Sequence, residues 1–262
     1  MKKLIVFALL IISLGSCKKE KYPLDENSGD EPQNGISIND ENSSTGQMKI
    51  ASSTILNATN ASQIPSQMFA VNQVYKTAYS HMGQPDGSSC SWTSYMLAIG
   101  SIARGNGNAY ECSPAKVYRI KEKCLEISPN DPKLITTLRS FGNTYDSQYI
   151  SAIYENGANN PTGRFIAIKK MLTHINTYHA PFLVIGTHYY ANGTKGAHYL
   201  VVHSIDWKVG GTGSTVYYTD CAFNCINGCS INPNLKSMNF TTFLDRMVER
   251  CQVYNMLFLR PN

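Results

Sequence analysis

The sequence lacks several features that would place it in common classes of protein. Its 262 residues carry a formal net charge of only +5 and contain no run of Lys and Arg interleaved with aromatic residues, so nucleic acid is not an expected partner. We find no internal repeat, and the Gly-rich segment 210–213 lacks the Lys-Thr/Ser pair of a phosphate-binding loop. What remains is a chain long enough for one folded domain of about 200 residues and a tail.

No apolar run is long enough for a mature membrane-spanning helix, but the first seventeen residues have the pattern of a signal peptide. The basic start at residues 1–3 is followed by an apolar run from Leu4 to Leu14. Residues 14–17, Leu-Gly-Ser-Cys, resemble the bacterial lipobox, in which cleavage leaves a new N-terminal Cys that is acylated. We expect Cys17 to carry lipid, including palmitate, and to anchor the protein to a membrane surface. The alternative is ordinary secretory cleavage.

The predicted location is the bacterial cell envelope, because a lipoprotein signal directs export. Lys18, rather than Asp, follows Cys17, so inner-membrane retention is not indicated and we expect the outer membrane, on its periplasmic face or at the cell surface. Residues 18–66 are rich in Ser, Asn, Gly and paired acidic residues, with few large apolar side chains. Such a segment buries too little surface to fold, so we predict a disordered tether over 18–66.

The segment from Gln84 to Ser94 places a cysteine at the expected start of a helix. Gly105 is the expected end, and apolar residues between them repeat at the spacing of one buried face: Trp92, Tyr95, Met96, Ile99 and Ile102. Ser89 is then the N-cap, and Cys90 lies in the first turn, where unpaired N–H groups and the helix dipole favour a thiolate. Cys90 is therefore the candidate nucleophile, although an isolated Cys in this position is more simply a buried structural residue.

Gln84 is the candidate donor to the oxyanion that forms when a thiolate attacks a carbonyl group. It precedes Cys90 by six residues, and its side-chain amide can act beside the Cys90 backbone N–H. The Gln, the five intervening residues, the Cys and the Thr-Ser at 93–94 resemble the papain superfamily, and within it the bacteriocin-processing (double-glycine leader) peptidases. Ser91 and Trp92 replace the Gly and Pro of that family. The resemblance implies a papain-like fold and a Cys-His-Asp triad.

A cysteine nucleophile needs a base, and His198 is the predicted one. It opens an apolar stretch directly after a turn, and the His, the aromatic residue, the valines and the Asp that follow resemble the histidine strand of the same family. His203 lies five residues further on, so it should face the opposite side of a strand. His188, in the preceding strand, is the alternative base. We interpret the other three histidines as surface or packing residues: His81, His174 and His179.

The acid that orients the base is predicted to be Asp220, with Asp206 as the alternative. Asp220 ends the stretch that follows the histidine strand, so a hairpin would return it beside the imidazole. Asp206 lies in the turn and is better placed for solvent. The resemblance supports Asp220, because the family has an Asp at the end of this strand, although Cys221 stands where the family often has Pro.

Six cysteines remain after lipidation and catalysis are assigned: Cys112, Cys124, Cys221, Cys225, Cys229 and Cys251. An even number in an exported protein favours disulfides. We predict that Cys112 pairs with Cys124 and leave the pairing of the other four open. A zinc site at Cys221, Cys225 and Cys229 is an alternative, although its spacing is unusual for zinc.

The predicted fold class is α+β, with a helical lobe that carries the Cys90 helix packed on an antiparallel sheet that carries His198. This domain is predicted to span residues 67–262. Within it, we expect a short helix or strand from Gln67 to Tyr79. We predict helices after Ser113, after Asn130 and from Pro161, and a late one from Thr241 to Cys251. Strands are predicted at 181–186, 198–207, 215–219 and 253–259, with Gly-rich turns at 192–193 and 210–213.

Together these residues predict a membrane-anchored cysteine peptidase with Cys90, His198, Asp220 and Gln84 as its catalytic groups. We expect a monomer that acts on a peptide or protein and uses no organic cofactor or metal. Two other functions remain open. One is an amidase or transferase with the same triad, and the other is a surface binding module that has lost turnover because Ser91 and Trp92 crowd Cys90.

Overall fold

The computed structural model describes residues 50–78, 82–189, 193–221 and 236–262. The helices are α1 (Ser52–Asn57), the 3-10 helix η1 (Ala61–Gln63), α2 (Gln73–Ala78), α3 (Cys90–Gly105), α4 (Pro114–Ile127), α5 (Ile135–Tyr145), α6 (Pro161–Tyr178) and α7 (Phe240–Cys251). The strands are β1 (Gln67–Ala70), β2 (Ile150–Ala158), β3 (Phe182–Tyr189), β4 (Lys195–Trp207), β5 (Thr215–Asp220), β6 (Lys236–Asn239) and β7 (Val253–Pro261).

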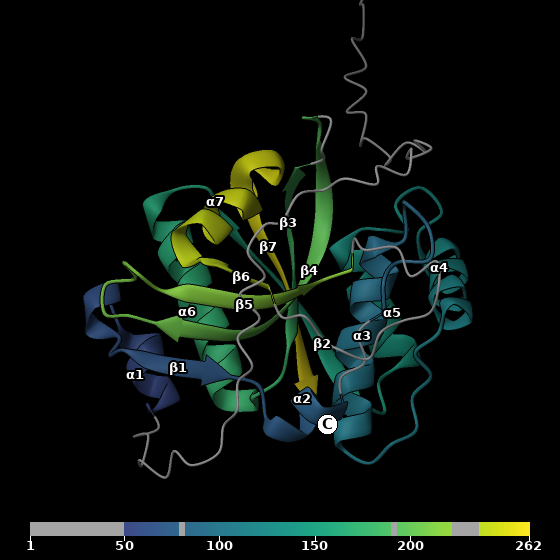
Figure 1. Cartoon of the computed structure of the whole chain (residues 1–262), viewed down its shortest axis with the longest axis horizontal. Helices are drawn as coiled ribbons and strands as arrows, with labels where there is room; N and C mark the ends of the chain where they lie inside the picture. Colours follow the sequence, from purple (N-terminus) through teal and green to yellow (C-terminus); the bar gives the residue numbers. More distant parts are fainter. Residues whose placement is uncertain (1–49, 79–81, 190–192, 222–235) are drawn as a thin grey trace, which may run out of the picture.

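One antiparallel sheet divides the molecule into two hydrophobic cores. Its strands follow the order β2-β7-β3-β4-β5-β6, and β1 also pairs with β4. Strand side chains alternate between faces: in β3, Phe182 and Val184 enter one core, whereas Leu183 and Ile185 enter the other. Helices α3, α4 and α5 lie on one side of the sheet, and α1, α6 and α7 lie on the other (Figure 1).

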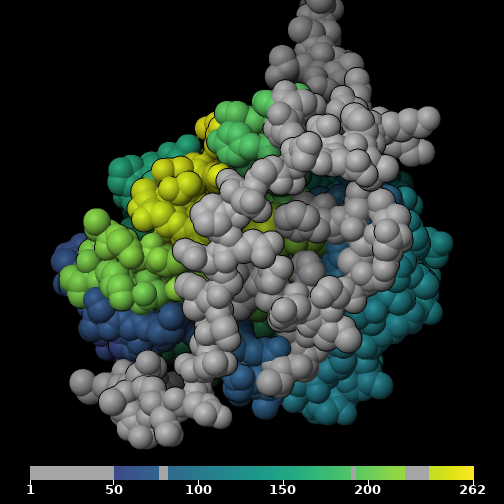
Figure 2. Space-filling model, viewed as in Figure 1, coloured from purple at the N-terminus to yellow at the C-terminus, as the bar shows by residue number. Residues whose placement is uncertain are grey.

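This architecture confirms the predicted α+β class, with the Cys90 helix on one side of an antiparallel sheet that carries His198. Figure 2 shows the same division on the surface, with the teal helices α4 and α5 and the yellow α7 on opposite sides of this face. Strands β2 and β6 were not predicted. Strand β2 lacks the strict alternation that identifies a half-buried strand, and β6 has only four residues, of which one is apolar.

Helix α3 begins at Cys90 and ends at Gly105, as predicted, but it is buried on every side rather than along one face. It packs against β4 and is covered by α2, α4 and α5. Two of its small polar residues are buried with main-chain partners: Ser94 donates to the carbonyl of Tyr199 at 3.1 Å and Ser101 to that of Tyr75 at 2.7 Å.

The other predicted helices form with small shifts. Ser113 and Asn160 cap α4 and α6 by accepting hydrogen bonds from main-chain N–H groups three residues on. Helix α5 starts at Ile135, later than expected from Asn130, and continues through Gly142 to Tyr145. In the part of the chain described above, no helix combines the length and apolarity required to cross a membrane.

The tether was predicted over residues 18–66, and its C-terminal boundary is wrong. Residues 50–66 form α1 and η1, and the side chains of Ile55 and Ile64 are fully buried in the core that α6 shares. Lys169 of α6 donates to the main-chain carbonyls of Leu56 and Ala58 at 3.0 Å each. Residues 50–66 therefore belong to the folded domain and not to the tether. The signal peptide, Cys17 and the tether up to residue 49 lie outside the described residues.

The predicted disulfide between Cys112 and Cys124 is absent, and both thiols are free. Cys124 lies on the buried face of α4. The sulfur of Cys112 instead packs against Gly100 of α3, where an added Cβ would approach it to 2.4 Å, and accepts a hydrogen bond from Arg104 at 3.0 Å. Cys221 and Cys251 are free as well. Cys225 and Cys229 lie outside the described residues, and with them the alternative zinc site.

Candidate active site

The nucleophile candidate stands at the N-terminal end of α3. The turn before it is held by Asp86, whose carboxylate accepts from the N–H and the hydroxyl of Ser88 at 2.8 and 2.9 Å. Ser89 occupies the N-cap position, as predicted, but its hydroxyl donates to the Asp86 carbonyl at 3.3 Å and does not cap the helix. Cys90 is thus the first helical residue, with a main-chain N–H that has no acceptor within the helix and a thiol at the positive end of the dipole.

The base candidate and the acid candidate meet across two neighbouring strands. The turn that joins β4 to β5 contains three glycines with positive φ, Gly210, Gly211 and Gly213, a conformation that favours glycine. The hairpin pairs Leu200 with Asp220. Nε2 of His198 then lies 2.6 Å from Oδ1 of Asp220, and both side chains are buried. Figure 1 shows β4 and β5 side by side with α3 next to β4.

Asp220 has a second cationic neighbour. Nζ of Lys236, from β6, lies 3.2 Å from Oδ2 of Asp220. Each carboxylate oxygen therefore has a positive or potentially positive partner. An ionised Asp220 can hold the imidazole in one orientation and stabilise its protonated state.

The electrostatics of the site favour a thiolate at Cys90. Burial opposes the charged sulfur, but hydrogen bonding with His198, the positive charge of His198, the Tyr199 backbone and the charge of Lys133 together lower the pKa of Cys90 below its ordinary value. Cys90 is 6% exposed. Its depressed pKa is the property that distinguishes a reactive cysteine from a structural one.

His198 shifts in the complementary direction. Burial works against its charged form, but hydrogen bonds with Asp220, Cys221 and Cys90 raise the pKa of His198 well above its ordinary value. A thiol with a lowered pKa beside an imidazole with a raised pKa favours a thiolate–imidazolium pair. The site can therefore hold the reactive ionic form before a substrate binds.

Cys221 links the Gln84 segment to this pair, although the sequence did not lead us to assign Cys221 to the site. The Gln84 N–H donates to the carbonyl of Cys221 at 2.8 Å. The sulfur of Cys221 contacts the carbonyl oxygen of Cys90 at 3.5 Å and the hydroxyl of Ser94 at 3.3 Å. Cys221 thus joins the Gln84 segment, the first turn of α3 and the end of β5. Its position directly after Asp220 was the feature of the sequence that could have indicated its place in the site.

The remaining candidates take other positions. Nε2 of His203 contacts Oγ1 of Thr219 at 2.8 Å. Thr219 and Asp220 are adjacent on a strand and point to opposite faces, so His203 and His198 also do, as predicted. Asp206 pairs with Lys208 at 3.0 Å, away from His198. The structure therefore brings together Cys90, His198, Asp220 and the Gln84 segment, and not the alternative acid.

Of the other described histidines, His188 lies beside the site, whereas His174 and His179 lie elsewhere in the fold. His188 lies beside His198, with ring centroids 5.1 Å apart, and burial together with the charge of His198 lowers the pKa of His188. His174 is buried and stacks on Phe258, and burial lowers its pKa to about 3, so it is a packing residue. His179 ends α6, where its ring contacts the carbonyl of Ala70. His81 lies outside the described residues.

One set of side chains at the site has the composition of a metal site. Ligand atoms of His188, His198 and Asp220 lie within 4.8 Å of one another, and two imidazoles and a carboxylate suit zinc. His198 and Asp220 already share a 2.6 Å hydrogen bond, however. We therefore interpret them as a base and its orienting acid.

Comparison with known proteins adds little to this geometry. No known family profile matches the sequence, and no curated protein matches it. Among solved structures, the chain is similar to UfSP from C. elegans, with a TM-score of 0.47 and 13% identity over 75% of this chain and 35% of that one. The chain thus spans about a third of the length of UfSP. A similarity at this level assigns no family.

Proposed function

We propose that the protein is a cysteine peptidase in which Cys90 attacks a peptide carbonyl, His198 moves the proton and Asp220 orients His198. The observation that carries the proposal is the buried His198–Asp220 pair, 2.6 Å apart, beside a thiol of lowered pKa at a helix N-terminus. A base, an acid that orients it and an adjacent activated nucleophile are the parts that covalent catalysis requires.

The proposed reaction begins with the thiolate of Cys90 and the imidazolium of His198. The sulfur adds to the substrate carbonyl, and the oxyanion is stabilised by the Cys90 N–H and the side-chain amide of Gln84. The imidazolium then protonates the leaving amine, which releases the first product and leaves an acyl-enzyme thioester. His198 next takes a proton from water, whose oxygen attacks the thioester carbonyl. The C–S bond then breaks, the acid product leaves, and the thiolate–imidazolium pair is restored.

The membrane anchor is part of the same proposal and is supported by the sequence alone. A lipid on Cys17 would hold the folded domain at the surface of the outer membrane. The substrate would then be a peptide or protein within reach of a tether of about thirty residues. The same triad on a non-peptide amide would make the protein an amidase or transferase.

A second candidate, a binding module without turnover, is favoured by the near-complete burial of Cys90. The crowding expected from Trp92 does not support it. The indole N–H of Trp92 donates to the carbonyl of Pro132 at 3.2 Å, on the side of the α4–α5 connection. Two positions along a helix are separated by about 200°, so Trp92 points away from Cys90.

The deciding experiment compares the mature chain with Cys90→Ser, using iodoacetamide labelling and hydrolysis of a peptide library. We expect Cys90 to be labelled at neutral pH, because its pKa is lowered, and hydrolysis to fall on the order of 10⁴-fold or more in the variant. Cys251→Ser is the matched control, since burial raises the pKa of Cys251. Ordinary thiol reactivity at Cys90 would favour the binding module, and unchanged hydrolysis in Cys90→Ser would reject the peptidase.

A further inference from the structure

A second thiol lies inside the proposed catalytic site and has no part in the reaction described above. Cys221 follows the acid Asp220 at the end of β5, is 1% exposed and carries a free sulfur. Its four neighbours through the sulfur or the carbonyl are the Cys90 carbonyl, Ser94, Gln84 and the His198 imidazole. A buried sulfur in contact with the proposed catalytic groups can take part in the chemistry of that site.

The two sulfurs share one imidazole. Cys90 and Cys221 both form hydrogen bonds with His198. The Cys221 sulfur is also 3.5 Å from the main-chain carbonyl of Cys90 itself. Both sulfurs therefore lie around the same imidazole, and formation of a disulfide would bring them to roughly 2.05 Å from each other.

The two thiols differ in the direction in which the site shifts their pKa. The combined influences on Cys90 lower its pKa, whereas burial, with the negative charge of Cys90 adding to it, raises the pKa of Cys221. An oxidant of the peroxide class reacts with a thiolate much faster than with a thiol. Cys90 would therefore be oxidised first, and Cys221 would remain reduced beside it.

We propose that Cys221 is a resolving thiol that captures oxidised Cys90 as a Cys90–Cys221 disulfide and so switches the enzyme off reversibly. The Cys90 thiolate attacks one oxygen of hydrogen peroxide, the O–O bond breaks, and Cys90 becomes a sulfenic acid while hydroxide leaves. The Cys221 sulfur then attacks the Cys90 sulfur. The S–O bond breaks, the oxygen leaves as water with the proton of Cys221, and the disulfide forms.

The switch protects the nucleophile from further oxidation. Without a partner, a sulfenic acid proceeds to sulfinic and sulfonic acids, which thiol reductants do not reverse. The disulfide is returned to two thiols by a dithiol reductant, which is itself oxidised by two electrons. The proposal rests on the proposed function, because a peptidase nucleophile is the group that the switch would control.

No other described cysteine can take this role. Cys112 packs against Gly100 and Arg104, Cys124 lies on the buried face of α4, and Cys251 is the last residue of α7. None of the three forms a hydrogen bond with His198 among the described contacts. Only Cys221, in the part of the chain that the structure describes, shares the environment of Cys90.

The test treats the reduced mature chain with hydrogen peroxide and identifies linked peptides by mass spectrometry without reduction. In the wild type we expect a Cys90–Cys221 linked peptide and loss of iodoacetamide labelling at Cys90, with full recovery after dithiothreitol. In Cys221→Ser we expect Cys90 to gain two or three oxygens and its labelling to remain lost after dithiothreitol. Cys251→Ser should behave as the wild type does.

Two results would overturn the proposal: a linked peptide that joins Cys90 to a different cysteine, or equal recovery of Cys90 labelling in the wild type and in Cys221→Ser. Cys221→Ala serves if the serine variant does not fold, and the linked peptide of the wild type is decisive if neither does. The readout does not need turnover. A Cys90–Cys221 link in a chain that hydrolyses no peptide would reject the peptidase and keep the thiol pair, whereas hydrolysis without the link would do the reverse.

Discussion

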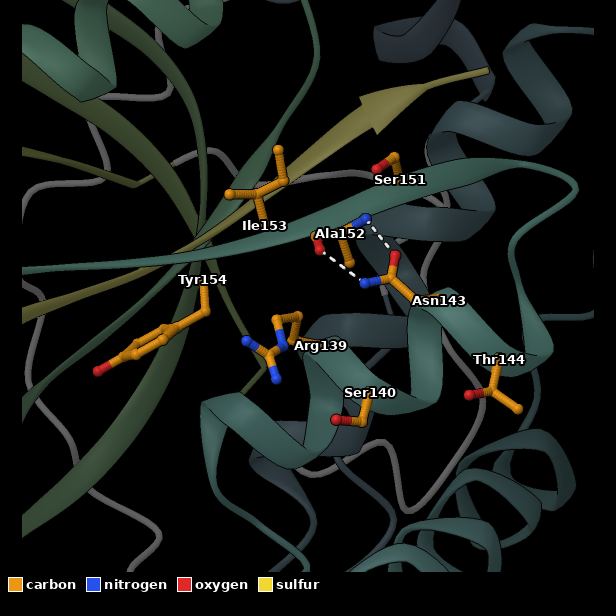
Figure 3. A pocket seen from close by; sticks show the side chains of 8 residues that line it. All are labelled: Arg139, Ser140, Asn143, Thr144, Ser151, Ala152, Ile153 and Tyr154. Carbon is orange, nitrogen blue, oxygen red and sulfur yellow. Dashed lines mark hydrogen bonds between the residues drawn. The ribbon is translucent and has the colours of Figure 1, made fainter.

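Two regions of the molecule are candidates for a functional site, and they differ in their titratable side chains and in how open they are. The Cys90 site is rich in titratable groups and almost closed, with Cys90, His198 and Asp220 all buried. The hollow between α5 and β2 is open, with a volume of about 530 Å³ (Figure 3). Volume alone would select the hollow, because ligand pockets commonly have this size.

The chemistry of the hollow is different. Its lining contains no histidine, cysteine or carboxylate: Arg139, Ser140, Asn143, Thr144, Ser151, Ala152, Ile153 and Tyr154. Figure 3 shows Asn143 of α5 reaching the main chain of β2, where its amide donates to the Ala152 carbonyl at 2.9 Å and accepts from the Ala152 N–H at 2.7 Å. Asn143 thus covers part of the exposed edge of an outer strand. The comparison indicates that clustered, perturbed titratable groups identify a reactive site better than volume does.

The sharpest way to break this comparison is to remove the base. His198→Ala should lower hydrolysis about 10³-fold, within the 10²–10⁴-fold range of general acid–base catalysis. His203→Gln is the matched control, since His203 lies on the same strand but contacts Thr219. Steady-state hydrolysis and the melting temperature should be measured for both. An equal loss in the two variants at equal stability would show that His198 has no special role.

Removal of the acid should have a smaller effect. Asp220→Asn keeps the shape of the side chain but removes the charge that stabilises the imidazolium, so we expect a loss on the order of tenfold, about 1.4 kcal/mol in the barrier. Asp206→Asn, at the surface pair with Lys208, should leave kcat/KM unchanged. A larger loss in Asp206→Asn than in Asp220→Asn would reverse the assignment of the acid.

The pH profile reports the two titrations of the proposed ion pair. The thiolate appears as pH rises through the lowered pKa of Cys90, so the acid limb should lie below the ordinary thiol value of about 8.5. The imidazolium is lost as pH rises through the raised pKa of His198, so the alkaline limb should lie well above about 6.5. In Asp220→Asn the alkaline limb should move to lower pH. Rates of hydrolysis and of iodoacetamide labelling check both limbs, and an alkaline limb that does not move would separate Asp220 from His198.

The local parts of this site could be predicted from the sequence, because their signals are local. The start of a helix at Cys90, the strand that begins near His198 and the Gly-rich turn that returns Asp220 each depend on residues within a short stretch. Their convergence depends on the hairpin, which the turn glycines also indicate. The choice of Asp220 over Asp206 followed from the same turn.

The parts that were missed depend on contacts between distant stretches. Cys221 meets Cys90 over 131 positions of sequence, and Lys236 reaches Asp220 from β6, a strand without a clear pattern. The contact of Lys169 with α1 is of the same kind, because nothing near Lys169 in the sequence shows that α1 will cover it. The pairing of Cys112 with Cys124 was wrong for the same reason: proximity in sequence does not determine where two sulfurs point.

The smallest expected effect on activity is at the hollow, where the comparison predicts a change in stability alone. Asn143→Ala removes both hydrogen bonds to Ala152, so unfolding should become easier by about 1–2 kcal/mol, seen as a lower melting temperature or denaturant midpoint. Hydrolysis per folded molecule should be unchanged, because no group of the hollow belongs to the proposed reaction. Arg139→Ala, on the same wall but outside these two bonds, is the control and should change neither quantity. A loss of hydrolysis in Arg139→Ala at unchanged stability would make the hollow part of the substrate site.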